Sequence, residues 1–196
     1  VCAGAGVGPR DIDEIIGVTK AYVTRVGGGP FPTEQDNEIG SAMQELGREF
    51  GTTTGRKRRC GWLDLVALRY AVRSNTLTSL ALTKLDVLSQ FDTIKVCVAY
   101  KYKGELIREF PVVLDVLCEC EPVYQDLPGW GRDISEARRL GDLPPEARSY
   151  LDFIQDTSGV PIRLVSVGPE RRQTILLDGD EDRLLQGKFL YFDDLP

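Results

Sequence analysis

Apolar side chains recur every three or four residues in four stretches of the chain, and this spacing predicts four amphipathic helices. In the first stretch, helical spacing is followed by Ile12, Ile15, Ile16, Thr19 and Val23. In the second, the acidic residues from Glu34 to Glu49 surround the apolar positions, so we expect them on a solvated outer face. The four predicted helices span about residues 11–25, 34–49, 63–72 and 145–158.

Short apolar runs between these stretches predict the strands. Residues 80–82 and 162–167 have the composition of buried strands, and residues 174–177 predict a further one. Residues 94–100 and 106–110 predict a hairpin with Lys103 and Gly104 in its turn. Prolines at 122 and 128 favour a loop over most of residues 114–130. Together the elements predict an α/β fold with a mainly parallel sheet and an added β-hairpin.

The composition is that of an ordinary globular chain, and it argues against several classes of function. Hydrophobic residues make up 42% of the 196 residues, and no apolar run reaches the ~18 residues of a membrane span, so we expect no membrane partner. The net charge of −6 argues against nucleic-acid binding, which usually needs a domain-wide basic face. Five irregularly spaced cysteines and no histidine argue against a zinc site or a disulfide framework. Reduced thiols are typical of a cytoplasmic protein.

The two ends of the chain suggest how it is organised. Val1 opens the sequence without an initiator methionine or a charged leader, so the chain reads as the interior of a longer protein. Acidic residues outnumber basic ones in residues 178–196, and we expect that tail to be partly ordered at best. We therefore predict one domain over residues 1–177, followed by an acidic tail over 178–196.

A stretch rich in hydroxyl and cationic side chains lies between residues 51 and 62. Three threonines stand between two glycines, and four cationic residues follow directly. Glycines let the backbone approach an anion, threonine hydroxyls donate to it, and arginine binds carboxylate or phosphate in bidentate geometry. A solvated basic loop or a nucleic-acid patch fits the same composition. The candidate anion-binding residues are Thr52, Thr53, Thr54, Gly55, Arg56, Lys57 and Arg58.

Two short motifs follow predicted buried strands. Residues 83–86 resemble the base-reading motif of guanine-nucleotide proteins. In that chemistry an aspartate accepts hydrogen bonds from the guanine N1–H and exocyclic amine, which adenine cannot donate, and a lysine stem lies along the purine face. Residues 166–168 end the second strand and could present backbone groups and a hydroxyl to a base edge. Both motifs could lie side by side at one rim of the sheet, although an ordinary surface turn would explain residues 83–86 as well.

Other signatures of chemistry are missing from the sequence. No G-x-x-x-x-G-K-[ST] phosphate loop occurs. No nucleophile–base pair is evident, since the chain has no histidine. We therefore assign no catalytic residue and no metal ligand to this chain.

Seven segments, in order along the chain, carry a resemblance to a known enzyme family. They are Gly4–Pro9, Lys20–Gly27, Gly29–Glu34, Glu49–Asp64, Thr83–Val87, Leu127–Trp130 and Ser166–Pro169. In this order they resemble the C-terminal part of adenylosuccinate synthetase, the GTP-dependent enzyme that joins IMP and L-aspartate. The resemblance extends to about Ile175. It implies the C-terminal portion of a P-loop-NTPase-like α/β fold.

The resemblance also implies roles for the candidate residues. The loop at 52–58 would close on the α-carboxylate of aspartate. Arg56 would contact aspartate near the IMP ribose, Val26 would give that ribose a backbone contact, and Arg58 would lie on the GTP side. The residues implied for the guanine pocket are Lys84, Leu85, Asp86, Ser166, Val167 and Gly168.

The resemblance leaves out much of the family's site. The phosphate loop, the catalytic residues and most IMP contacts belong to an amino-terminal portion that this sequence lacks, and we expect the Mg²⁺ ligands there as well. The family forms homodimers, and in its reaction GTP phosphorylates the IMP 6-oxygen before aspartate displaces the phosphate. We therefore expect this chain alone to be inactive. A non-catalytic guanine-nucleotide-binding module and a basic-loop nucleic-acid binder are the alternatives.

Overall fold

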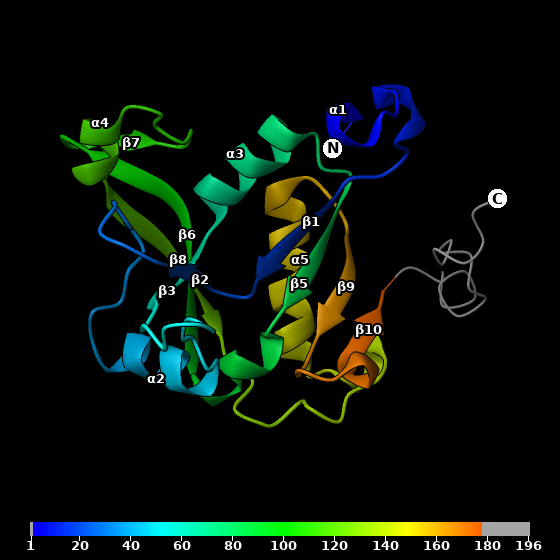
Figure 1. The fold of residues 1–196 in the computed structure, drawn as a ribbon. Coiled ribbons are helices and arrows are strands. Elements are labelled where there is room, and N and C mark those ends of the chain that lie inside the picture. The colour runs from blue at the N-terminus through cyan, green and yellow to red at the C-terminus, as the bar shows by residue number, and fades with distance from the viewer. Residues whose placement is uncertain (1, 178–196) are drawn as a thin grey trace.

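The computed structural model describes residues 2–177 of the chain. These residues form two four-stranded sheets, a two-stranded pair and the helices that join them (Figure 1). The acidic tail predicted for residues 178–196 lies outside the described residues.

The first sheet has the strand order β1 (Ile16–Lys20), β5 (Ser79–Thr83), β9 (Ile162–Ser166) and β10 (Thr174–Leu176). The first three strands run parallel, and β10 runs antiparallel to β9. Helix α5 (Pro145–Ser158) lies alongside this sheet and leads into β9 (Figure 1). The predicted buried strands, the last strand and this helix are confirmed.

The second sheet is built around the long strand β6 (Thr93–Tyr102). It pairs in parallel with β4 (Leu63–Asp64) and antiparallel with β7 (Glu105–Ile107) and β8 (Glu121–Pro128). The predicted hairpin is confirmed: its turn residues Lys103 and Gly104 have φ angles of 49° and 89°, as a tight hairpin turn requires. The hairpin is therefore part of a separate, mainly antiparallel sheet rather than an addition to the parallel one.

Helix α3 (Leu65–Asn75) packs against both β6 and α5, and so joins the two sheets. A third, small sheet pairs β2 (Val23–Arg25) with β3 (Arg59–Gly61). The other elements are α1 (Cys2–Ala5), α2 (Glu38–Leu46), α4 (Leu114–Cys118) and the short 3-10 helices η1 (Pro9–Asp11), η2 (Leu85–Gln90), η3 (Leu140–Asp142) and η4 (Arg171–Gln173).

The helix predicted over residues 11–25 is wrong. That segment forms η1, β1 and β2, with β1 paired along its whole length to β5. Most of the apolar residues that suggested the helix are β-branched, such as Ile16 and Val23, and such side chains favour strands. Over so short a run, the apolar spacing fits a helix face and a strand almost equally well. Pairing with the buried strand β5 makes the segment a strand.

The loop predicted over residues 114–130 is also largely wrong, because α4 and β8 occupy most of it. Strand β8 pairs only with β6 among the described residues, so it is an edge strand of its sheet. Proline is tolerated there because an edge strand has one side without a ladder. Pro122 and Pro128 stand near its two ends, opposite Tyr100 and Thr93.

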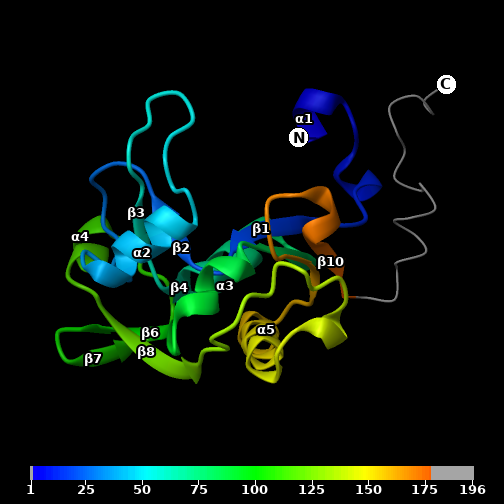
Figure 2. The same cartoon turned by 90° about the horizontal axis from the view of Figure 1, so that it is seen from below.

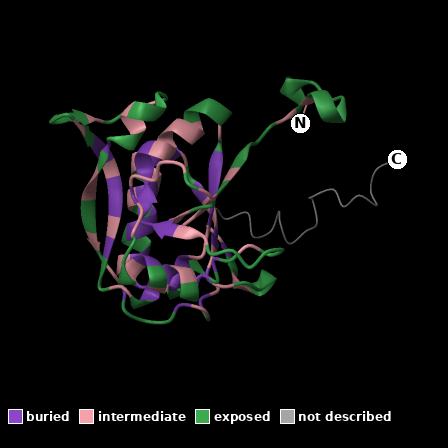
Figure 3. Cartoon of the chain, turned by 60° about the vertical axis from the view of Figure 1, so that its left-hand side comes forward, coloured by how far each residue is buried: buried purple, intermediate pink, exposed green. Residues whose placement is uncertain are grey.

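One core unites the two sheets. Leu80 and Leu82 of β5, Ile94 and Val96 of β6, and Ile154 of α5 are all fully buried in a single apolar cluster. Figure 3 shows this buried layer running through the centre of the molecule, while α1 and the turn between β6 and β7 are mostly exposed. Within residues 2–177, no helix is both long enough and apolar enough to cross a membrane.

Candidate functional site

The carboxyl ends of β1, β5 and β9 meet at one edge of the first sheet. Lys20 pairs with Thr83 between β1 and β5, and Leu82 pairs with Val165 between β5 and β9. The residues that follow these strands are therefore neighbours, and the expectation that the two strand-end motifs lie side by side is confirmed. Ligands bind at this edge in open α/β sheets. Figure 2 views the molecule from below, the side toward which the strands β5 and β9 of Figure 1 point.

A buried carboxylate, that of Glu49, gathers four donor side chains at this edge. The Glu49 side chain is 0% exposed. Its Oε1 accepts hydrogen bonds from Tyr22 Oη at 2.6 Å, Lys84 Nζ at 2.7 Å and Lys20 Nζ at 2.9 Å. Its Oε2 accepts from Arg58 Nη1 and Lys20 Nζ, each at 2.9 Å. We call these five residues the Glu49 cluster; three cations share one anion in it, so the cluster has excess positive charge.

The pKa values in the Glu49 cluster follow from burial and from these bonds. Burial by itself would raise the pKa of Glu49, but the hydrogen bonds from Lys84, Tyr22 and Lys20 outweigh it and hold that pKa at about 2. Burial lowers the pKa of Lys20, against the opposing effect of Glu49. Burial also raises the pKa of Tyr22 above its usual range, and its bond to Glu49 adds to this. Glu49 is therefore an anion at neutral pH, and Tyr22 is a neutral donor.

The turn after α2 brings Glu49 into the cluster. Asn37 caps the start of α2 with its side-chain oxygen, and Gly47 follows the last helical residue. A Cβ on Gly47 would lie 2.1 Å from the Tyr22 hydroxyl oxygen, so a side chain does not fit there. Arg48 then adopts a left-handed conformation, with φ 48°. The chain reverses here, and the expected solvated position of Glu49 is wrong: its side chain turns into the protein.

Lys84 connects β5 to this turn. Its Nζ donates to the Gly47 carbonyl at 2.5 Å as well as to Glu49. Its backbone is left-handed, with φ 61°, which costs a non-glycine residue roughly 1 kcal/mol. The two side-chain bonds therefore hold Lys84 in an unfavourable backbone conformation, and its stem has a fixed course along the edge.

Asp86, in the first turn of η2, has an acceptor without a donor. Its Oδ1 is buried and accepts no hydrogen bond from any residue in the range 2–177. Burial raises the pKa of the Asp86 carboxyl and Asp133 adds to the effect, while its own backbone amide and Lys84 oppose it. A buried polar atom left unpaired costs about 1–3 kcal/mol, so such an atom in a folded protein calls for an explanation. A ligand that donates hydrogen bonds would supply one.

The turn after β9 is tightly closed, and β9 itself contacts η2, the element that contains Asp86. Ser166 Oγ donates to the Gly168 carbonyl at 2.9 Å, and the backbone N–H of the fully buried Val167 donates to the Gln173 carbonyl at 2.9 Å. A Cβ on Gly168 would lie 2.3 Å from the side-chain oxygen of Gln173. These hydrogen bonds hold the backbone at this end of β9 in shape, and a side chain at 168 would require the Gln173 side chain to move.

The threonine-rich loop extends outward between α2 and β3 (cyan in Figure 2). Residues 52–57 are exposed, and the base of the loop is closed by hydrogen bonds of 2.8 Å from Gly51 N to the Arg56 carbonyl and from Gly55 N to the Gly51 carbonyl. The Arg56 side chain makes no hydrogen bond or ion pair with the described residues. Arg58, in contrast, is tied to Glu49. The structure thus brings Arg58 together with Lys84 and leaves Arg56 facing solvent.

Val26 lies on the exposed loop that follows β2, with 60% of its surface accessible. Arg59 organises this loop, since its Nη1 donates to the carbonyls of Gly27 at 2.9 Å and Gly29 at 2.8 Å. The Arg59 Nε in turn donates to Glu34 at 2.6 Å. The backbone next to Val26 is therefore held in place. None of these hydrogen bonds connects Val26 to the Glu49 cluster.

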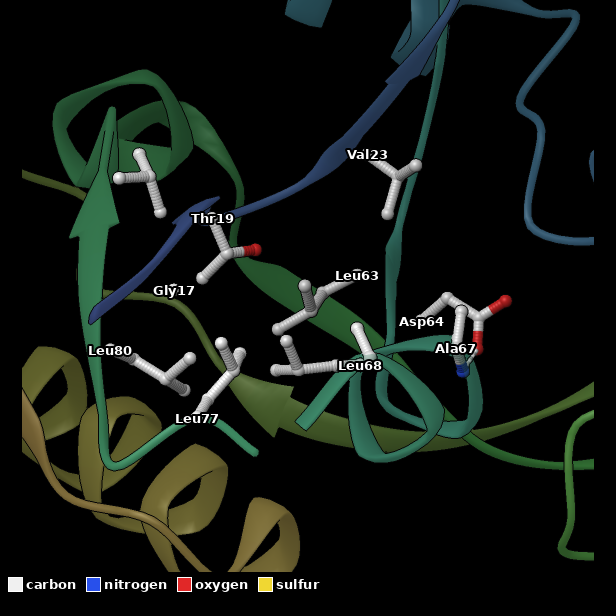
Figure 4. A pocket seen from close by; sticks show the side chains of 11 residues that line it. Gly17, Thr19, Val23, Leu63, Asp64, Ala67, Leu68, Leu77 and Leu80 are labelled. Atoms are coloured by element: carbon white, nitrogen blue, oxygen red, sulfur yellow. Dashed lines mark hydrogen bonds between the residues drawn. The ribbon is translucent and has the colours of Figure 1, made fainter. Parts of the chain in front are cut away.

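A separate cavity of about 250 Å³ lies between β1, α3 and the start of β5 (Figure 4). Its lining residues are mostly apolar and include Leu63, Leu68, Leu77 and Leu80. Asp64 faces the cavity, but one of its carboxylate oxygens caps α3 and the other accepts a hydrogen bond from the Tyr100 hydroxyl. The cavity therefore offers little to an anion. Within residues 2–177, no group of three His, Cys, Asp or Glu side chains could hold a metal ion.

Comparison with known proteins places the chain in a family. The family model of adenylosuccinate synthetase matches residues 1–175. The chain belongs to the adenylosuccinate synthetase family. It is 56% identical over 176 residues to the adenylosuccinate synthetase of Geotalea daltonii and 58% identical over 177 residues to that of Carboxydothermus hydrogenoformans. These matches cover 90% of this chain and 41% and 42% of the two relatives, so the chain spans about two fifths of their length.

A solved structure shares the fold as well. The chain is similar to the fully ligated adenylosuccinate synthetase of Plasmodium falciparum, with a TM-score of 0.86 and 41% sequence identity. The match covers 89% of this chain and 42% of that one. The mixed α/β fold is therefore that of the matching part of an adenylosuccinate synthetase.

Sequence reasoning missed three members of the Glu49 cluster in this synthetase segment. Lys20, Tyr22 and Glu49 received no role of their own, although they lie within segments that carried the resemblance. The one available signal was an acidic residue seven positions before the first of four consecutive cations. That signal does not say which cation the acid would meet, because Lys84 and Lys20 come from distant strands.

Proposed function

We propose that the chain is part of a GTP-dependent ligase of the cytoplasm that joins IMP and L-aspartate, giving adenylosuccinate, GDP and phosphate in de novo AMP synthesis. The family membership supports this proposal. The arrangement of residues at the carboxyl edge of β1, β5 and β9 agrees with it. This chain would contribute the guanine pocket and the loop that binds aspartate.

The buried and unpartnered Asp86 Oδ1 is the observation that carries the guanine pocket. Guanine offers N1–H and an exocyclic amine on one edge, and a carboxylate can accept from both. The Lys84 stem, fixed by its bonds to Glu49 and Gly47, would lie along the purine face. The rigid turn at 166–168 would close the other side of the pocket, with Leu85 and Val167 as its apolar support.

The loop at 52–58 would bind the aspartate substrate. Arg56 has an unpaired guanidinium on an exposed loop, so it is free to meet the α-carboxylate and the IMP ribose nearby. Arg58 would turn toward GTP from the base of the loop, and Val26 would contact the IMP ribose through its backbone. The three threonine hydroxyls would add donors to the same carboxylate.

The remainder of the chemistry would come from the segment that the relatives have and this chain lacks. We place the catalytic residues and the Mg²⁺ ligands there on the basis of the family membership. The complete protein would act as a homodimer.

The test is adenylosuccinate formation from GTP, IMP and L-aspartate, followed by the absorbance change of the purine. We expect the purified 196-residue chain to be inactive. The same chain joined behind the amino-terminal part of the Carboxydothermus hydrogenoformans relative, here called the complete synthetase, should be active. Activity of the chain alone would overturn the first expectation. Tight GTP-selective binding by the chain, with no activity in the complete synthetase, would favour a non-catalytic guanine-binding module instead.

A further inference from the structure

We propose that Glu49 is a positioning residue that links the aspartate loop to the guanine pocket. This inference rests on the proposed function for the identity of the two ligands. The link itself is a property of the Glu49 cluster: Arg58 at the base of the loop and Lys84 at the end of β5 bind the two oxygens of one buried carboxylate.

Glu49 controls the course of the Lys84 stem. The left-handed backbone of Lys84 is held by its Nζ bonds to Glu49 and to the Gly47 carbonyl. Both acceptors belong to the turn after α2. A change in that turn therefore moves the stem that would flank the purine, and a purine packed on the stem in turn restrains the turn.

Glu49 also controls the base of the loop. Its Oε2 accepts from the Arg58 side chain, and its backbone carbonyl accepts from the Arg58 N–H at 2.9 Å. Gln44 on α2 adds a bond of 2.8 Å to the Arg58 carbonyl. The start and the end of the loop are thus joined through one residue, so a movement of Arg58 changes the hydrogen bonds of Glu49.

The excess of cations lets the link survive loop movement. If Arg58 turns toward a nucleotide, Glu49 still keeps its bonds from Lys20, Tyr22 and Lys84. A buried carboxylate with a single partner would be left uncompensated by such a movement, at a high cost. Glu49 can therefore release Arg58 and receive it again, while Lys84 stays in position.

The first test uses the 196-residue chain without ligands and follows amide hydrogen exchange over residues 50–58 and 83–88. Glu49→Gln should increase exchange in both segments, by at least about fivefold. Lys84→Met should increase exchange at residues 50–58, because the Lys84 Nζ bonds connect it to the turn after α2 that precedes them. In the Glu49→Gln background, Lys84→Met should add little. Equal effects of Lys84→Met in the two backgrounds would show that Glu49 does not carry the link.

The second test uses the complete synthetase and measures the KM for aspartate at low and at saturating GTP. In the unmodified enzyme, saturating GTP should lower that KM, and Glu49→Gln should remove most of the difference. Tyr22→Phe deletes one donor to Glu49 without a change of charge and should give a smaller loss of the same kind. It serves in place of Glu49→Gln if that variant does not fold. Glu109→Gln is the matched control, because the Glu109 side chain is 75% exposed and pairs with the exposed Arg73.

The outcomes separate the inference from the proposed function. An active enzyme whose KM for aspartate depends on GTP equally in all variants would overturn the inference and leave the function standing. An inactive complete synthetase would count against the function, and the hydrogen-exchange test would still decide on the link.

Discussion

Glu49 and Asp86 are both carboxylates at the carboxyl edge of the parallel sheet, yet the protein treats them in opposite ways. Glu49 is fully buried and accepts five hydrogen bonds, and its pKa is held at about 2. Asp86 is half-buried and has a buried oxygen with no partner among residues 2–177, and burial raises its pKa. The chain itself supplies the hydrogen-bond donors to Glu49, whereas Asp86 Oδ1 has an acceptor position that a donor from outside residues 2–177 could fill. From this contrast we expect Glu49 to organise the edge of the sheet and Asp86 to bind a ligand.

The largest effect that this contrast predicts is on stability. Glu49→Gln in the 196-residue chain should lower the free energy of unfolding at pH 7 by on the order of 3 kcal/mol, because three cations lose their anion. Urea unfolding measures this loss. Glu109→Gln, which removes an exposed carboxylate, should change it by at most about 1 kcal/mol.

The pH dependence of the same measurement gives a second check. The pKa of Glu49 is about 2 in the folded chain, below the ~4.3 of an unfolded glutamate. Its contribution is therefore complete above the unfolded value and is lost as the pH falls from there toward 2. The Glu49→Gln variant should lack this part of the acid-induced loss. Parallel curves for both proteins would contradict the assignment.

The next effect in size concerns Asp86 and tests the ligand half of the contrast. In the complete synthetase, Asp86→Asn should weaken GTP and relatively favour xanthosine triphosphate, since an amide can donate where the carboxylate only accepted. We expect a change in preference of at least about tenfold, equal to roughly 1.4 kcal/mol. It is measured as the ratio of kcat/KM for the two nucleotides. The variant should keep its urea stability, unlike Glu49→Gln; an unchanged nucleotide ratio would remove Asp86 from the pocket.

The smallest structural effect should come from substitution of Arg56, whose side chain pairs with neither Glu49 nor Asp86. Arg56→Leu should leave the stability of the chain within about 0.5 kcal/mol, because the side chain is exposed and unpaired. In the complete synthetase it should raise the KM for aspartate more than that for GTP. Arg148→Leu, at an exposed arginine of α5 outside the proposed sites, is the matched control. An aspartate KM that responds equally to both substitutions would argue against a specific role for Arg56.

Local patterns predicted the parts of the fold that local physics decides. The strands at 80–82 and 162–167, the hairpin turn at 103–104 and the helix ending at Gly159 follow from apolar runs, turn residues and a glycine C-cap. Residues 11–25 could not be assigned in this way, since β-branched residues over a short run fit a helix face or a strand, and pairing with β5 decides. Likewise, the prolines of β8 favoured the prediction of a loop, although the segment is an edge strand.

The candidate site likewise has one part that local sequence patterns predicted and one part that they did not. The motifs at 83–86 and 166–168 were visible because each follows a recognisable buried strand, and parallel pairing then brings them together. The burial of Glu49 was not predictable. It depends on a turn whose shape is set by Gly47 and Arg48 and on lysines that come from β1 and β5. Contacts between distant segments decide such a position, and hydrophobic spacing carries no information about them.

The outer position of β1 has a practical consequence for work with the chain. Within residues 2–177, β1 pairs on one side only, and Val18 at its centre is 76% exposed. The strand has no proline, and its one charge, on Lys20, stands at its end. An edge of this kind is a template for another strand. We therefore expect the chain to self-associate as its concentration rises, and a strand-forming peptide that occupies β1 should keep it dispersed.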